Sequence, residues 1–280
     1  MCKRKKYSSN FRLLTKFHHR YFASKHKKME FKNLHNQDKP LLIGNVWDVP
    51  STKTAERLNV QAIGTSSSAI ASILGYNDGE EMEFSELEYF VKRIALNTNL
   101  PLSVDLESGY SRKPKEIVNH IKRLTKLGVV GINIEDSVVL KEKRILLDAN
   151  DFAKTLTEIK EHLEKENIDI LINVRIDTFI LLQENVIGET IKRIHLYQNA
   201  GANGIFTPCI EKENDIKTIV NSTNLPINVM CMPNLPNFEI LTKLGVKRIS
   251  MGNFLFDKMY DKFEETVQTV INQNSFKSIF

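Results

Sequence analysis

The sequence predicts an α/β fold: one (β/α)8 TIM barrel, in which eight parallel strands alternate with helices. The length of 280 residues suits such a domain, which typically takes about 250 residues. Eight short apolar runs alternate with longer amphipathic runs along the chain. Several amphipathic runs end in glycine, the residue preferred just after a helix. This βα rhythm favours a closed barrel over an open sheet.

The apolar runs are the expected strands, because parallel strands covered on both faces are almost uniformly apolar. In chain order they are residues 41–46, 62–65, 102–106, 131–134, 170–176, 204–207, 227–230 and 248–251. The amphipathic runs repeat their apolar residues at the helical period. They predict helices at residues 51–58, 85–97, 114–127, 151–165, 189–198, 213–220, 237–244 and 261–272.

We expect a single catalytic domain at residues 31–280, preceded by a basic, disordered arm at residues 1–30. Residues 1–28 hold ten Lys or Arg and no acid, so the rest of the chain has 29 basic and 34 acidic residues. The net charge of +5 therefore belongs to the arm, and the body shows no sign of a nucleic-acid groove. No apolar run approaches the ~18 residues that cross a bilayer. Neither nucleic acid nor a membrane is an expected partner.

The cysteines Cys2, Cys209 and Cys231 match no zinc or redox spacing. Reduced thiols and a cytoplasmic location are therefore expected. The basic, acid-free composition of the arm is also that of a transit peptide, so organellar import is the alternative.

Polar side chains gather where the predicted strands end, and the active site of such a barrel lies at these ends. The third strand leads to Asp105 and Glu107, the fourth to Asn133 and Glu135, and the fifth to Arg175. Side chains two positions apart on a strand point to the same side. If these sides face inward, three carboxylates and an arginine meet at one mouth.

Carboxylates held close together repel one another, and a divalent cation removes that conflict. Oxygen ligands alone favour Mg2+ or Mn2+ over zinc. Such an ion can polarise a substrate carbonyl and stabilise an enolate, while Arg175 can bind a substrate carboxylate in a bidentate fork. The alternative is that these acids cap helices or form ion pairs at the barrel rim.

Two further segments are open to two interpretations. Residues 65–68 offer hydroxyl and backbone N–H groups to a carboxylate or phosphoryl group, or form a plain polar turn. Asp78 lies within residues 75–80, whose composition indicates a turn, so the residues alone make it a loop position.

Six ordered stretches resemble the isocitrate lyase/phosphoenolpyruvate mutase superfamily. They are residues 45–48, 64–67, 74–80, 104–110, 131–137 and 173–177. The resemblance implies a Mg2+-dependent (or Mn2+-dependent) barrel acting on small 2-oxo or 2-hydroxy acids. Such enzymes break or form a C–C or P–C bond next to a carboxylate, through a metal-stabilised enolate. The resemblance also implies exchange of the last helix between the subunits of a homodimer or homotetramer.

The resemblance also implies roles for individual residues within the matching stretches. The implied metal ligands are Asp105, Glu107 and Glu135. The implied substrate-binding residues are Trp47, Ser66, Ser67, Asn133 and Arg175. The implied catalytic residues are Asp78, Glu135 and Arg175.

One departure limits the functional prediction. The isocitrate and methylisocitrate lyases carry a Lys-Lys/Arg-Cys-Gly-His motif after the fourth strand, whereas residues 136–144 contain neither Cys nor His. The thiol that would protonate the leaving enolate is missing. The chain therefore looks like the carboxyvinyl-carboxyphosphonate phosphorylmutase-like members.

Three functions are compatible with these observations. The first is a metal-dependent C–C lyase or decarboxylase acting on a small oxo acid such as oxaloacetate. The second is a P–C bond phosphomutase or phosphonopyruvate hydrolase, in which Lys141, Lys143 or Arg144 reaches a phosphoryl group. The third is a non-catalytic barrel that binds small carboxylates.

Overall fold

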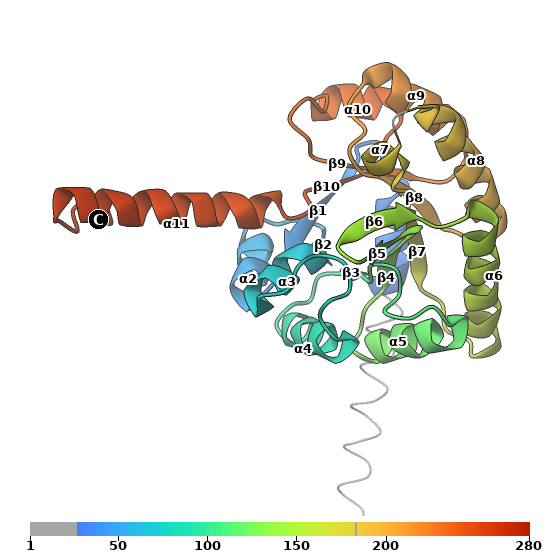
Figure 1. Cartoon of the computed structure of the whole chain (residues 1–280), viewed down its shortest axis with the longest axis horizontal. Helices are drawn as coiled ribbons and strands as arrows, with labels where there is room; N and C mark the ends of the chain where they lie inside the picture. Colours follow the sequence, from blue (N-terminus) through green and yellow to red (C-terminus); the bar gives the residue numbers. More distant parts are fainter. Residues whose placement is uncertain (1–26, 183) are drawn as a thin grey trace, which may run out of the picture.

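Eight parallel strands close into a barrel in the order β1-β10-β9-β8-β7-β4-β3-β2 (Figure 1). The computed structural model describes residues 27–182 and 184–280. The barrel strands are β1 (Leu41–Val46), β2 (Ala62–Thr65), β3 (Leu102–Asp105), β4 (Gly131–Glu135), β7 (Leu171–Arg175), β8 (Gly204–Thr207), β9 (Ile227–Met230) and β10 (Arg248–Ser250). The predicted (β/α)8 fold is confirmed, and four predicted strands match to the residue.

Helices surround the barrel because each buries one apolar stripe against it, as α4 does with Leu87, Val91 and Ile94. The helices are α2 (Val49–Arg57), α3 (Ser67–Leu74), α4 (Phe84–Ala95), α5 (Pro114–Lys126), α6 (Ala149–Lys165), α7 (Thr178–Leu181), α8 (Val186–Asn199), α9 (Glu213–Asn221), α10 (Phe238–Leu244) and α11 (Phe254–Gln273). Across residues 27–182 and 184–280, no helix is long and apolar enough to cross a membrane.

Two segments form structure where the sequence indicated loops or turns. Helix α3 begins at Ser67, and the side chain of Ser66 caps it by accepting a hydrogen bond from the backbone of Ala69 at 3.3 Å. The segment after β4 is an antiparallel hairpin of β5 (Ser137–Leu140) and β6 (Lys143–Leu146).

The final helix also differs from its prediction. Helix α11 begins at Phe254, not at residue 261, and it projects away from the barrel (Figure 1). Phe256 is its one buried residue, so most of the helix lacks a neighbour within the described chain.

A phenylalanine closes the bottom of the barrel, where the strands begin. Residues 27–34 form a helix, and its fully buried Phe31 packs with Leu41, Ala62 and Leu171 at the strand starts. A Cβ atom at Gly131 would lie 2.7 Å from the Phe31 ring, so only glycine leaves room for this plug. Residues 27–30 of the expected arm thus belong to a helix, and residues 1–26 lie outside the described residues.

A buried ion pair joins the end of β4 to helix α8. The carboxylate of Asp136, which is fully buried, accepts hydrogen bonds from Arg193 Nη1 at 2.7 Å and from the Tyr197 hydroxyl at 2.9 Å. Its other oxygen accepts the backbone N–H of Asp177 at 3.0 Å. Asp136 therefore fixes the two strand ends, β4 and β7, that carry Glu135 and Arg175.

We expect the substitution Asp136→Asn to lower the free energy of unfolding by up to about 3–5 kcal/mol, because it leaves the buried guanidinium of Arg193 with the partly exposed Glu189 as its remaining counter-ion. Urea unfolding at neutral pH measures the loss. The control Tyr197→Phe removes one hydrogen bond and should cost about 1 kcal/mol. Equal losses in the two variants would contradict the structural role given to the ion pair.

Candidate active site at the carboxyl ends of the strands

A cavity of about 140 Å³ opens at the carboxyl ends of the barrel strands. It is much smaller than the ~300–1,000 Å³ typical of drug-sized ligands, so it suits a small acid. Six of the sequence-predicted residues line it: Ser66, Ser67, Asp78, Asp105, Asn133 and Arg175.

Asp105 is the last residue of β3, and its side chain faces the cavity. Ser67 Oγ donates a hydrogen bond to Asp105 Oδ2 at 2.8 Å, and the backbone N–H of Asp105 donates to Thr65 Oγ1 at 2.9 Å. Burial raises the pKa of Asp105, while the nearby charge of Arg175 and the bond from Ser67 oppose that rise. The strand end and the start of α3 therefore hold this carboxylate in a fixed position.

Glu107 lies two residues beyond β3, where the backbone turns into the left-handed region with φ of 47°. Its side chain is only 2% exposed. Glu107 Oε1 accepts a hydrogen bond from the Tyr110 hydroxyl at 2.8 Å, and Oε2 has no hydrogen-bond partner among the described residues. Burial, helped by the charge of Asp78, raises the pKa of Glu107 to about 8. Among the described residues, neither Asp105 nor Glu107 forms an ion pair with a protein cation, and burial favours the protonated form of both.

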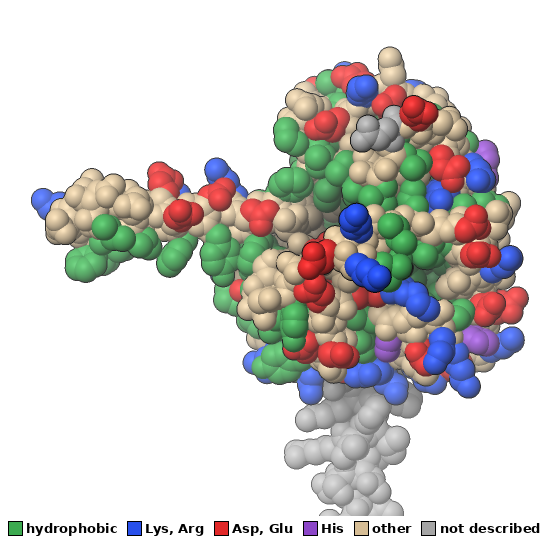
Figure 2. Space-filling model, viewed as in Figure 1, with side chains coloured by type: hydrophobic (Ala, Val, Ile, Leu, Met, Phe, Trp, Pro, Cys, Tyr) green, Lys and Arg blue, Asp and Glu red, His purple; other side chains and the backbone are tan. Residues whose placement is uncertain are grey.

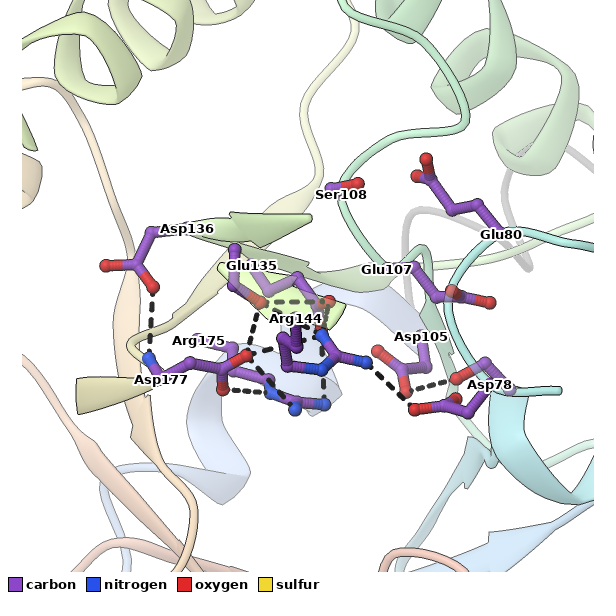
Figure 3. Close-up of polar contacts among 12 residues, drawn as sticks. Asp78, Glu80, Asp105, Glu107, Ser108, Glu135, Asp136, Arg144, Arg175 and Asp177 are labelled. Atoms are coloured by element: carbon purple, nitrogen blue, oxygen red, sulfur yellow. Dashed lines mark hydrogen bonds and ion pairs between the residues drawn. The ribbon is translucent and has the colours of Figure 1, made fainter. Parts of the chain in front are cut away.

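Arg175, at the end of β7, is held between two carboxylates (Figure 3). Its Nη1 lies 3.1 Å from Glu135 Oε2, and its Nε and Nη2 donate to Asp177 at 2.6 and 3.2 Å. Burial disfavours the charge of Arg175, but Glu135 and Asp177 outweigh that effect and raise its pKa well above the usual value. Arg175 is therefore a fixed cation at the cavity wall.

Arg144 reaches across the mouth from β6 (Figure 3). Its Nη1 contacts Glu135 Oε1 and donates to Ser137 Oγ at 2.9 Å. Its Nη2 donates to Asp78 Oδ2 at 2.9 Å, on the opposite side of the guanidinium. The hairpin that replaces the lyase loop therefore places an arginine over the site.

The loop that carries Asp78 also packs tightly on the hairpin. Gly79 has φ of 122°, and a Cβ atom there would lie 2.3 Å from Val139 Cγ2. Glycine is thus required both for the backbone conformation and for this approach. The two segments form one cover over the cavity, joined by a packing contact and by the ion pair between Arg144 and Asp78.

Three predicted site residues do not line the cavity. Trp47 is 6% exposed and packs edge-to-face against Phe256 of α11, with ring centroids 5.3 Å apart. Glu107 lies behind Asp105, and Glu135 is occupied by two arginines. In the described part of the chain, no three His, Cys, Asp or Glu side chains are placed to hold one metal ion. Of the three carboxylates expected to converge, Asp105 thus lines the cavity, whereas Glu107 and Glu135 do not, and the metal-ligand set stays a prediction.

Several cavity residues, among them Ser103 and Arg248, had no role predicted from the sequence, and Arg144 was only one of three loop candidates. Arg248 begins the last strand, two positions before the inward-facing Ser250. The two-residue period could have found it. Arg144 lies in a charged run that is typical of a solvated loop, and its contact with Asp78 spans 66 positions. No local pattern indicates that contact.

The fold and the cavity define a (β/α)8 barrel with a small, polar and charged cavity at the carboxyl ends of its strands. The sequence profile of the phosphoenolpyruvate phosphomutase family matches residues 31–271, and the chain belongs to this family. The predicted resemblance to the phosphoenolpyruvate mutase/isocitrate lyase superfamily is thereby confirmed.

The chain is also similar to individual proteins, among them the following three. An uncharacterized protein of Mycobacterium tuberculosis is 34% identical over 80% of this chain and 82% of its own length. A putative phosphonomutase structure from Burkholderia cenocepacia J2315 has 30% identity and a TM-score of 0.81, covering 86% of this chain and 99% of its own. An oxaloacetate decarboxylase of Pseudomonas entomophila is 26% identical over 75% of this chain and 72% of its own length.

The raised pKa of Glu107 makes stability depend on pH in the metal-free protein. Between the ordinary value of 4.5 and the folded value of about 8, the folded state keeps a proton that the unfolded chain has lost. The stability contributed by that proton disappears as the pH rises through the folded pKa. The free energy of unfolding should therefore fall from pH 5 towards pH 8, by at most about 1.4 kcal/mol per pH unit.

Urea unfolding in the presence of EDTA, at pH 5 to 8, measures this dependence. The difference between wild type and Glu107→Gln isolates the contribution of Glu107, because the amide does not titrate. If the two proteins show parallel pH profiles, Glu107 is ionised throughout and the raised pKa is refuted.

Proposed function

We propose that this protein is a metal-dependent carbon–carbon lyase or decarboxylase acting on a small 2-oxo or 2-hydroxy dicarboxylic acid, with oxaloacetate as the first candidate. The observation that carries the proposal is the pair of Asp105 and Glu107 beside the small cavity, with a buried oxygen of Glu107 left without a partner. Membership of the phosphomutase family and the relative named oxaloacetate decarboxylase support it.

The oxygen donors at this site suit Mg2+ or Mn2+. Asp105 and Glu107 would hold the ion, and water would supply further ligands, since Mg2+ usually keeps several waters and takes one or two carboxylates. The unpartnered Oε2 of Glu107 and the raised pKa of Asp105 are what a site built for a cation shows without one. When bound, the ion would polarise an oxo group of the substrate.

The chain's own residues supply binding and orientation. The first turn of α3, beginning at Ser67 after the cap Ser66, presents backbone N–H groups to a substrate carboxylate. Arg175 places a fixed positive charge on the neighbouring wall, and Asp78 lies above the cavity. In a decarboxylation the electrons of the broken C–C bond pass to the adjacent oxo group. The carbon that has lost the carboxylate, which leaves as CO2, then takes a proton from water. No residue equivalent to the lyase thiol is therefore required.

Arg144 gives the runner-up function a specific observation in its favour. A guanidinium binds phosphoryl oxygens well, and this one lies over the mouth beside Asp78. A P–C bond phosphomutase or phosphonopyruvate hydrolase would use it to hold the phosphoryl group. Phosphorus NMR of phosphonopyruvate incubated with the protein distinguishes this activity from C–C cleavage.

With Mg2+ present, purified protein should turn over at least one acid in a panel of small oxo and hydroxy diacids. Asp105→Ala should reduce the rate by several orders of magnitude, because it removes the carboxylate nearest the reacting groups. The exposed acid Asp151, changed to Ala, is the control and should keep wild-type activity.

Calorimetric titration with Mg2+ must accompany the assay. If Mg2+ binds and neither the diacids nor phosphonopyruvate react, the catalytic proposal fails and a non-catalytic carboxylate-binding barrel remains. Asp105→Ala should abolish the Mg2+ binding in either case.

We further propose that a second copy of this chain covers α11, by exchange of this helix within a homodimer or a pair of dimers. Helix α11 has 20 residues and carries exposed apolar side chains along one face (Figure 2). Phe263 is 65% and Ile271 60% exposed. Because α11 follows the last barrel strand but leaves the barrel, the equivalent helix of another copy can occupy the vacated position.

Phe263→Glu should convert the assembly to monomers, because it puts a charge in the middle of the apolar face. Light scattering coupled to size-exclusion chromatography measures the mass. Lys258→Glu, which changes an exposed charge on the opposite face, is the control and should leave the mass unchanged. A monomeric wild type would contradict the exchanged dimer.

A further inference from the structure

Arg248 is a buried arginine without a counter-ion at the deep end of the cavity. It begins β10, points into the barrel, and is 2% exposed. Its Nη2 makes one long hydrogen bond, 3.4 Å, to Asn133 Oδ1. Its Nε and Nη1 are buried and find no hydrogen-bond partner among residues 27–182 and 184–280. No carboxylate of those residues forms an ion pair with it.

Keeping an unpaired guanidinium away from water is costly, so such a residue calls for an explanation. The Phe31 ring below offers weak compensation, since its centroid is 6.0 Å from the guanidinium carbon, at the limit of a cation–π contact. Burial lowers the pKa of Arg248 to about 10, and only Asp105 opposes that effect. Arg248 therefore keeps its charge at neutral pH without a partner to balance it.

Neighbouring arginines show what a structural role looks like in this protein. Arg193 is also buried and Arg175 is partly buried, and each contacts carboxylates at 2.6–3.1 Å. Both are thus neutralised within the fold. Arg248 differs from both, because its Nε and Nη1 have no acceptor among the described residues.

A second unsatisfied donor lies at the same end of the cavity. Ser103 also lines it, is 1% exposed, and has a hydroxyl without a partner in the described structure. Ser103 precedes Asp105 by two positions on β3, so its side chain lies about 7 Å deeper in the barrel. One hydroxyl and one guanidinium thus face the deep end of the cavity.

We propose that Arg248, assisted by Ser103, binds the carboxylate of the substrate that lies farther from Asp105, and so makes the site selective for dicarboxylates. In the barrel, β10 is separated from β3 by β1 and β2. The positive group on β10 and the carboxylate pair next to β3 therefore act on a substrate from different sides. The inference deepens the proposed function and rests on it for the substrate class, but it concerns binding and is tested without turnover.

The test compares succinate with butyrate, which has the same number of carbons and one carboxylate fewer. Calorimetric titrations in Mg2+ give the dissociation constants for wild type and for Arg248→Met, which keeps the length of the side chain and removes its charge. Wild type should bind succinate at least about tenfold more tightly than butyrate, the loss expected for one charged hydrogen bond. Arg248→Met should bind the two acids about equally. Arg57→Met, on the barrel exterior, is the matched control and should keep the preference.

The melting temperature of the ligand-free variant separates recognition from a structural role. An unpaired buried charge predicts that Arg248→Met is as stable as wild type or more stable. A retained preference for succinate would overturn the inference, and a lower melting temperature beside it would assign Arg248 to holding the barrel together. If Arg248→Met does not fold, Arg248→Lys replaces it in the binding test, because lysine keeps the charge but lacks the paired N–H donors of the guanidinium. It should weaken succinate binding and leave butyrate binding unchanged.

The two proposals fail in different ways. A lost succinate preference in Arg248→Met, with no turnover of any acid by wild type, would uphold the binding role and refute the enzyme. Turnover of a diacid by wild type, with an unchanged preference in Arg248→Met, would uphold the enzyme and refute the role of Arg248.

Discussion

The geometry of the mouth depends on Arg175 being held between Glu135 and Asp177. Glu135 and Arg175 are paired residues of adjacent strands, and Asp177 is the second residue after β7, so the ion pairs join the two strand ends. Arg144 binds the same carboxylates from the hairpin above. One consequence is that Glu135 has no free oxygen for a cation. A second is that the hairpin, without a thiol, is anchored over the cavity by charge.

The charges that this cluster leaves unbalanced lie around one small volume. Asp105 and Glu107 are carboxyl groups near β3 without an ion pair among the described residues, and Arg248 is a positive group on β10. Under the proposed function, a small diacid would satisfy both groups only with its metal-binding end towards Asp105. Water is a poor substitute, because two of the three side chains are almost fully buried. The polarity of the site therefore supports a fixed orientation of the substrate before any bond breaks.

Local sequence patterns were sufficient for the strands and for the side chains that still belong to them. Asp105 and Arg175 end their strands and face the cavity, as the two-residue period requires. The same period fails at Glu107, because the positive φ there ends the extended backbone. The start of helix α3 was not predicted, because residues 65–68 also suit a polar turn. The role of Ser66 as its cap depends on the strand before it. The position of Arg144 depends on a hairpin packing against a distant loop, which no short-range pattern encodes.

The Phe31 plug closes one end of the barrel, and the cavity opens at the other end. The helix at residues 27–34 meets the barrel where the strands begin, whereas the cavity opens where they end. A group attached directly ahead of residue 27 therefore lies at the end of the barrel opposite the mouth. A tether or affinity tag attached there leaves the entrance clear, whereas one attached after α11 is joined to the segment expected to pair with another subunit. For immobilising the protein with its entrance accessible, the amino-terminal side is the better anchoring point.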